Sequence, residues 1–255
     1  MKPIISIAHV MAGYDGKTVL RDVSLDVFER DFLGIIGPNG GGKTTLVRIL
    51  LGLMKPRSGT VSYFRDGSPV DTLTMGYLPQ YTAIDRKFPI SVYEVVLSGL
   101  TRQKRFLRPY TQAQHAQVRE TLHEMELDGL ERRPIGTLSG GQLQRVLLSR
   151  AIVSHPEVVV LDEPDTYIDK RSQDQMYRML TRINSRCAII MVSHDVGMVL
   201  QSVKNVACVN ETLHYHPSME IDSTWIEEHF GCPMELLTHG DVPHRVLKNI
   251  VIDAE

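Results

Sequence analysis

The sequence has little cysteine, no large excess of charge of either sign and no long apolar run. Its three cysteines, Cys187, Cys208 and Cys232, are too few and too scattered for a disulfide framework, which indicates a reducing setting. Lys and Arg number 28 against 30 Asp and Glu, so the net charge is −2 and the basic bias of a dedicated nucleic-acid-binding protein is missing. No stretch approaches the roughly 18 consecutive apolar residues of a membrane-spanning helix, and we expect no secretory leader at residues 1–10. Any role at a membrane therefore depends on a partner.

The overall composition is that of a globular protein. Hydrophobic residues make up 42% of the 255 residues and charged residues 23%, which excludes a disordered or fibrous chain. The length suits one sizeable α/β core with an inserted or appended subdomain.

Hydrophobic spacing predicts the main elements. Alternating apolar residues predict half-buried strands, continuous apolar runs predict buried strands, and 3.6-residue spacing predicts helices. The half-buried strands are expected at 4–10 and 18–28, the buried strands at 32–36, 158–161 and 187–192, and the helices at 91–100, 111–127 and from Gly140 to about Ser154. Thr111 and Gln114 fit a capping box at the start of the second helix.

A glycine-rich segment follows the predicted strand 32–36. Residues 37–44 fit the pattern G-x-x-x-x-G-K-[ST], and an apolar helix that stops near Pro56 follows them. Glycines let backbone N–H groups converge on phosphate oxygens, and the start of the helix adds positive potential. Lys43 is expected to reach the β- and γ-phosphates of a nucleotide, and the hydroxyl of Thr44 to bind Mg²⁺.

Two carboxylates end the predicted strand 158–161. Asp162 is placed to hold Mg²⁺, which prefers oxygen ligands, and Glu163 is placed to orient or deprotonate an attacking water. A third segment, Leu138–Gln142, opens another helix with Ser139 as a possible cap. Composition alone leaves open whether this is a second anion site or a plain helix start after a glycine linker.

In this order the motifs resemble those of the nucleotide-binding subunit of an ABC (ATP-binding cassette) transporter. The phosphate loop is 37–45, the signature 138–142 and the Walker B strand 158–162 with Glu163, while Gln80, Asp169 and His194 match the Q-loop, D-loop and switch residues. The resemblance covers about residues 4–215. It implies an α/β P-loop NTPase (RecA-like) core with an N-terminal antiparallel β subdomain and an inserted α-helical subdomain. The core and β subdomain would comprise about 1–80 and 155–215, the helical subdomain 81–154 and a C-terminal extension 216–255.

The same resemblance implies roles for individual residues. Lys43, Gln80, Glu163 and His194 would be catalytic, with Glu163 as general base and His194 at the γ-phosphate, and Tyr14 would stack on adenine. Thr44, Gln80 and Asp162 would bind Mg²⁺. The ATP contacts would be Tyr14, Gly37, Pro38, Asn39, Gly40, Gly41, Gly42, Lys43, Thr44 and Thr45. Ser139, Gly140, Gly141, Gln142 and Asp169 would act across a dimer, on ATP held by a second copy. Two residues depart from the common pattern: Asp165 follows Walker B, and Gly41 stands where Ser or Ala is frequent.

The implied partners are multispanning permease subunits, a second copy of this chain and, indirectly, a substrate-binding protein, with no nucleic acid. The implied location is the cytoplasmic face of the inner membrane, as a peripheral protein. The segment Asp85–Val96, the Pro38–Lys43 loop and the tail from Gly231 resemble the subfamily that imports zinc, manganese or iron. A siderophore or cobalamin importer stays open as an alternative, as does a soluble ABC ATPase that acts on DNA, RNA or ribosomes.

Two further groups of residues, one of histidines with a cysteine and one of basic residues, each allow two interpretations. His214, His216, His229, Cys232, His239 and His244 are either a regulatory zinc site or surface histidines. Arg102, Lys104, Arg105 and Arg108 are either a solvated loop or a contact with the membrane partner or its lipids.

Overall fold

The computed structural model describes residues 2–80, 88–103, 108–166, 168–194, 196–216, 234–239 and 242–247. The chain forms two compact units. Unit 1 comprises residues 1–4, 27–31 and 62–191, and unit 2 comprises residues 5–26, 32–61 and 192–255. The division into core, helical subdomain and C-terminal extension stays a prediction.

Unit 2 contains a parallel strand pair that ends at the phosphate loop. Strand β3 (Phe32–Ile36) is buried throughout and pairs in parallel with β9 (Asn205–Asn210), from Leu33 opposite Asn205 to Ile36 opposite Cys208. Strand β10 (Thr212–His216) pairs antiparallel with β9. Helix α6 (Val196–Ser202) lies against β3 so closely that a Cβ on Gly34 would meet Val199 at 2.4 Å.

Unit 2 also contains one helix and most of two long strands. Strand β1 (Pro3–Tyr14) neighbours β2 (Lys17–Phe28) and β4 (Ser58–Arg65), and β4 continues into unit 1, where it pairs antiparallel with β5 (Ser68–Val70). Helix α1 (Lys43–Leu50) ends six residues before the predicted stop near Pro56, because the chain turns through Leu51–Met54 with backbone bonds back to Arg48 and Val47. Near the end of the chain, β11 (Met234–His239) and β12 (Val242–Leu247) pair antiparallel as a hairpin.

Unit 1 contains a buried parallel sheet. Strand β6 (Met75–Leu78) pairs in parallel with β7 (Val158–Asp162), and β7 neighbours β8 (Ala188–Val192). Every residue of β7 and β8 is buried, as continuous apolar runs predict for a sheet covered on both faces. A Cβ on Gly76 would lie 2.1 Å from the carbonyl oxygen of Ala151, so glycine permits the close approach of β6 to the end of α4.

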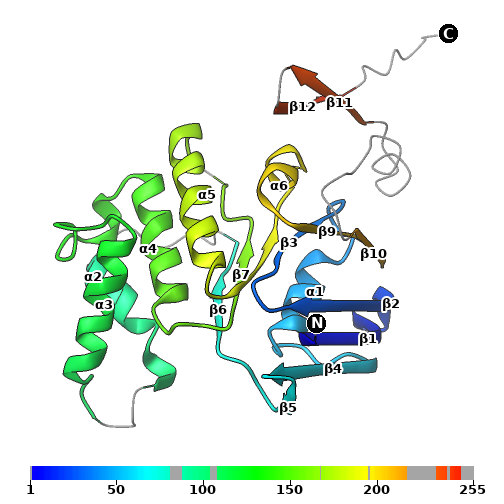
Figure 1. Cartoon of the computed structure of the whole chain (residues 1–255), viewed down its shortest axis with the longest axis horizontal. Helices are drawn as coiled ribbons and strands as arrows, with labels where there is room; N and C mark the ends of the chain where they lie inside the picture. The colour runs from blue at the N-terminus through cyan, green and yellow to red at the C-terminus, as the bar shows by residue number, and fades with distance from the viewer. Residues whose placement is uncertain are drawn as a thin grey trace. The chain divides into compact units, whose positions relative to one another are not determined.

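Helices make up the rest of unit 1 (Figure 1). They are α2 (Val92–Ser98), α3 (Gln112–Glu124), α4 (Gly140–Ile152) and α5 (Lys170–Asn184), with short 3₁₀ turns at Thr101–Gln103 and Ile135–Thr137. Helix α2 packs against α3 and α4, and α4 also packs against α5. The capping box of Thr111 and Gln114 is confirmed. Helix α3 stops at Glu124, three residues earlier than predicted, because Glu126 adopts a left-handed backbone conformation.

Candidate functional site

The phosphate loop in unit 2 has a backbone that only glycine can follow. Gly37, Gly40 and Gly42 have φ angles of 148°, 80° and 104°, in the region that L side chains rarely adopt. A Cβ on Gly37 would lie 2.1 Å from the carbonyl oxygen of Val209 in β9, and one on Gly41 would lie 2.7 Å from the same atom. The glycine at position 41, where the family often has Ser or Ala, therefore sets how closely the loop approaches β9.

The lysine of this loop is buried and held by the loop itself. Lys43 is 7% exposed, and its ammonium donates hydrogen bonds to the carbonyl oxygens of Gly37 at 2.8 Å and Pro38 at 2.9 Å. Helix α1 begins at Lys43 with no acidic residue in its first turn, so the ammonium and the helix N-terminus together make the loop electropositive. This arrangement fits an anion such as a phosphate. Thr44 is exposed and Thr45 is buried.

An exposed tyrosine lies beside the same helix. Tyr14 ends β1 and is 41% exposed, and its hydroxyl accepts a hydrogen bond of 3.1 Å from Nη1 of Arg48. Arg48 and Thr44 are the two exposed residues of α1 and are four positions apart, so they share one face of the helix. Arg48 was not predicted as a site residue, although its spacing from Thr44 could have indicated it.

His194, the predicted switch histidine, follows β8. The N–H of Ser193 donates a hydrogen bond of 3.2 Å to the carbonyl of Ile35 in β3, and Ser193 is fully buried. His194 comes next and is exposed. Unit 2 thus holds Tyr14, the loop residues 37–45 and His194.

The two carboxylates at the end of β7 have different surroundings in unit 1. Asp162 is buried, whereas Glu163 is half-buried and has a φ of 49°. Backbone strain of this kind is often found where a side chain must point in a particular direction. Nε2 of Gln80, which follows β6, donates a hydrogen bond of 2.7 Å to Oε2 of Glu163. The structure therefore brings together the predicted general base and the predicted Q-loop residue.

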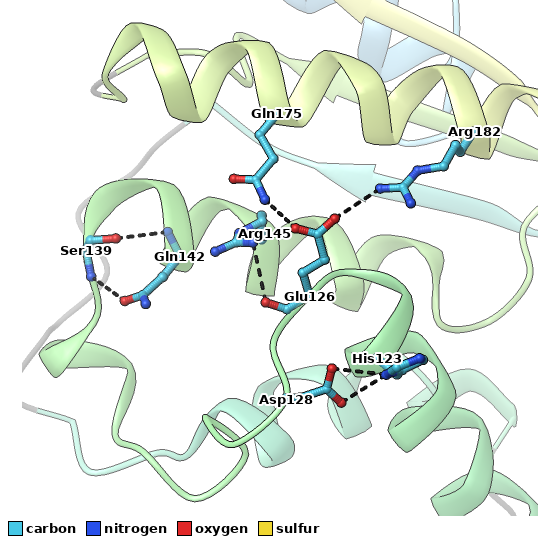
Figure 2. A network of polar contacts seen from close by, with 8 residues as sticks. All are labelled: His123, Glu126, Asp128, Ser139, Gln142, Arg145, Gln175 and Arg182. Carbon is cyan, nitrogen blue, oxygen red and sulfur yellow. Dashed lines mark hydrogen bonds and ion pairs between the residues drawn. The ribbon is translucent and has the colours of Figure 1, made fainter.

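The signature segment forms the start of α4. Ser139 Oγ accepts from the N–H of Gln142 at 3.2 Å, and Gln142 Oε1 accepts from the N–H of Ser139 at 3.1 Å (Figure 2). This capping box confirms the predicted role of Ser139 as a helix cap. Two residues later, Gln144 is buried and donates through Nε2 to the carbonyl oxygen of Pro164, directly after Glu163.

Asp169, the predicted D-loop residue, caps α5. Asp169 accepts from the N–H of Ser172 at 3.0 Å and from its hydroxyl at 2.8 Å. These two bonds, the backbone one first, lower the pKa of Asp169 below its ordinary value. A Cβ on Gly141 would lie 2.4 Å from Oγ of Ser172, so the signature glycine packs directly on this cap. Gln144 and Ser172 were not predicted; Ser172 could have been found from its three-residue spacing after Asp169.

The remaining predicted features are Asp165 and the histidine and basic groups, and several of these residues lie outside the described part of the chain. Asp165 faces α5, where its Oδ2 accepts from Tyr177 at 3.1 Å and from Gln173 at 3.3 Å. In the tail, His214 and His216 belong to β10, whereas His229 and Cys232 lie outside the described residues, and no cluster of metal-ligating side chains occurs in the part of the chain that is described. Arg102 and Arg108 are exposed, and Lys104 and Arg105 lie outside the described residues.

Among the described residues, no helix is both long enough and apolar enough to cross a bilayer.

Residues 20–166 match the family model for the ABC transporter. The chain is 39% identical to a probable metal transport system ATP-binding protein of Chlamydia trachomatis serovar D over an alignment of 222 residues. The alignment covers 86% of this chain and 91% of that protein. It is 36% identical to the zinc import ATP-binding protein ZnuC of Pseudomonas syringae pv. syringae, over 98% of this chain and 92% of that protein.

Solved structures give the same fold. One is an ABC transporter in an inward-facing conformation, with a TM-score of 0.85 at 23% identity over 96% of this chain and 97% of that one. Another is a nucleotide-free ATP-binding cassette of an ABC transporter, with a TM-score of 0.75 at 20% identity over 91% and 96%. These likenesses confirm the predicted α/β P-loop fold. This chain belongs to the ABC transporter family, as an ATP-binding subunit that hydrolyses ATP.

Proposed function

We propose that this ATP-hydrolysing subunit energises the import of a divalent metal ion, namely zinc, manganese or iron, through a membrane permease. One observation carries the proposal. Relatives that share 36–39% of their residues with this chain, over 83–98% of its length, are named metal transport or zinc import ATP-binding proteins. The segment Asp85–Val96 and the Pro38–Lys43 loop support the same cargo class, because their sequences resemble that subfamily.

The phosphate loop holds the nucleotide in this proposal. The backbone N–H groups of the loop 37–42, other than at Pro38, which has none, and the N-terminus of α1 surround the terminal phosphates, and Lys43 neutralises their charge. Tyr14 stacks on adenine. Glu163 accepts a proton from the attacking water, and Gln80, bonded to Glu163, orients the same carboxylate.

The oxygen donors at the predicted metal residues fit Mg²⁺. Asp162 offers a buried carboxylate, Thr44 an exposed hydroxyl and Gln80 an amide oxygen, all of them hard ligands. When bound, Mg²⁺ would supply positive charge to the β- and γ-phosphates. The protein residues that hold it would be these three, and the positioning of water falls to Glu163 and His194.

A second copy of the chain completes the site. Ser139, Gly140 and Gly141 present the start of α4, and Asp169 caps α5 beside it. The start of α4, which has no acidic residue in its first turn, suits contact with an anion held by another molecule. ATP therefore closes two copies on each other, and the closure moves the permease.

The permease contact lies near Gln80. Phe88 is 58% exposed, an unusual exposure for a large aromatic side chain, and it lies between Gln80 and α2 in the sequence. An exposed aromatic residue eight positions after Gln80 in the sequence supports a protein contact that senses the nucleotide site. The location that follows is the cytoplasmic face of the membrane, as a peripheral subunit.

A deletion strain tests the cargo. Growth is measured with zinc, manganese and iron limited one at a time, and uptake of each labelled ion is measured in parallel. We expect a defect for at least one ion, rescued by the native gene and by Lys55→Ala, an exposed lysine, but not by Lys43→Ala. A defect confined to siderophore or cobalamin use, or to nucleic-acid or ribosome function, would contradict the proposal.

A further inference from the structure

Glu126 occupies a backbone position that usually belongs to glycine. The N–H of Leu127 donates to the carbonyl of Leu122 at 2.9 Å, and the N–H of Glu126 donates to that of His123 at 3.0 Å, which is the bond pattern of a Schellman motif at the end of α3. Glu126 itself has a φ of 55°. A side chain in this conformation costs roughly 1 kcal/mol, so a glutamate here indicates a use for its carboxylate.

That carboxylate joins three elements (Figure 2). From α5, Nη2 of Arg182 lies 3.4 Å from Oε1, and Nε2 of Gln175 donates to Oε2. From α4, Nη1 of Arg145 lies 3.8 Å from Oε2 and donates to the backbone carbonyl of Glu126 at 3.4 Å. The Arg145 side chain is only 16% exposed, and a cation so well covered requires an anion close by. We call Glu126, Arg145, Gln175 and Arg182 the α4–α5 clamp.

The clamp is not the only contact between these helices. Gly141 of α4 packs on Ser172 of α5, whose hydroxyl bonds to Asp169. Arg145 is four residues beyond Gly141, about 6 Å further along α4. Two contacts separated along a helix fix its angle to a neighbour, whereas one contact leaves a pivot.

We propose that Glu126 is a positioning residue that fixes the angle between α4 and α5, so that the signature residues 139–142 and Asp169 meet a second copy as one preformed surface. The proposal rests on the proposed function, in which these segments close on ATP held by the partner. Glu126 touches no nucleotide in this scheme. Its loss should therefore weaken closure of the dimer and leave ATP binding by a single copy unchanged.

The test uses the full chain with Glu163→Gln, which is expected to hold ATP without hydrolysing it. Glu126→Gly is added, because glycine removes the carboxylate and relieves the left-handed backbone, so the fold is retained. Asp66→Gly is the matched control, since Asp66 is also an exposed acid with a φ of 53° in a turn outside the clamp. ATP affinity is measured at protein concentrations too low for dimerisation, and ATP-driven dimerisation is measured by sedimentation.

We expect Glu126→Gly to weaken dimerisation about tenfold or more, with ATP affinity within about twofold of the parent, and Asp66→Gly to match the parent in both. Arg182→Gln removes the partly exposed cation that α5 contributes to the clamp. This variant should also weaken dimerisation without changing ATP affinity. If both clamp variants dimerise like the parent, or if they lose ATP affinity in proportion, the role of Glu126 is wrong. If the parent itself fails to dimerise with ATP, the proposed function fails first and the role of Glu126 falls with it.

Discussion

Nε2 of Gln80 lies 2.7 Å from Oε2 of Glu163 and donates a hydrogen bond to it. The bond occupies part of the carboxylate that is proposed to accept a proton from water. A water molecule that bonds to Glu163 must therefore share this carboxylate with the Gln80 amide. Movement of the segment after Gln80 would change the base directly, which gives the proposed permease contact a short route to the chemistry.

Glu163→Gln should slow ATP hydrolysis about 10²- to 10⁴-fold, because an amide accepts no proton from water at neutral pH. ATP binding should persist, since the phosphate loop in unit 2 is unchanged. Phosphate release and equilibrium binding of ATP measure the two effects separately. Glu120→Gln, at an exposed glutamate of α3, serves as the control. Hydrolysis at the native rate by Glu163→Gln would show that another group is the base.

Tyr14→Ala should weaken ATP binding through loss of stacking, by about 1–3 kcal/mol or roughly five- to hundredfold. Tyr14→Phe keeps the ring and loses only the hydroxyl that accepts from Arg48, so its effect should stay below about threefold. Inorganic tripolyphosphate has no base, and its affinity should be the same for all three proteins. Equal losses for ATP and tripolyphosphate would contradict a stacking role.

Glu157 should contribute to stability at neutral pH and lose that contribution in acid. Two bonds of 2.7 Å from Arg65 lower the pKa of Glu157 from its ordinary 4.5, against the effect of burial, and the N–H of Thr74 adds to the lowering. A carboxyl group whose pKa is lower in the folded than in the unfolded chain stabilises the fold at any pH above its pKa in the unfolded chain. This contribution is lost as the pH falls through the pKa of the group in the folded chain. The stability difference between the native chain and Glu157→Gln, measured by urea unfolding, should therefore be largest at neutral pH and shrink as the pH falls below 4.5. A difference that does not change with pH would contradict this account.

Cys187 and Cys208 should resist alkylation in the folded protein. Burial raises the pKa of each thiol to about 11, so only about one thiol in a thousand is ionised at pH 8. In a Cys232→Ser background, we expect no labelling by iodoacetamide in an hour at pH 8 and two labels after denaturation. Mass spectrometry counts the labels, and rapid labelling of the folded Cys232→Ser chain would mean that the segments holding Cys187 and Cys208 open often.

The phosphate loop and the carboxylates of β7 could be predicted because their chemistry depends on residue types at fixed spacing. Gly37 and Gly42 need positive φ angles, and an apolar run must carry Asp162 to the end of a buried strand. The capping residues Thr111 and Ser139 were predictable for the same reason, since a cap acts over three residues.

The contacts of α4 could not be predicted in this way. Gln144 meets Pro164, Gly141 meets Ser172, and Arg145 meets Glu126, at separations of about 20 to 31 residues. No local pattern indicates such pairs, because tertiary packing brings them together. The early end of α3 has the same origin, since nothing in the sequence marks Glu126 as a residue that would adopt the conformation of a glycine.

The reciprocal bonds of Ser139 and Gln142 have one more consequence. Side chains satisfy the N–H groups of these two residues, and the geometry of a helix start leaves the amides of Gly140 and Gly141 without a carbonyl inside α4. Recognition at this end of the helix is then a property of the main chain. Substituting a side chain can disturb where those amides point, but it cannot delete them.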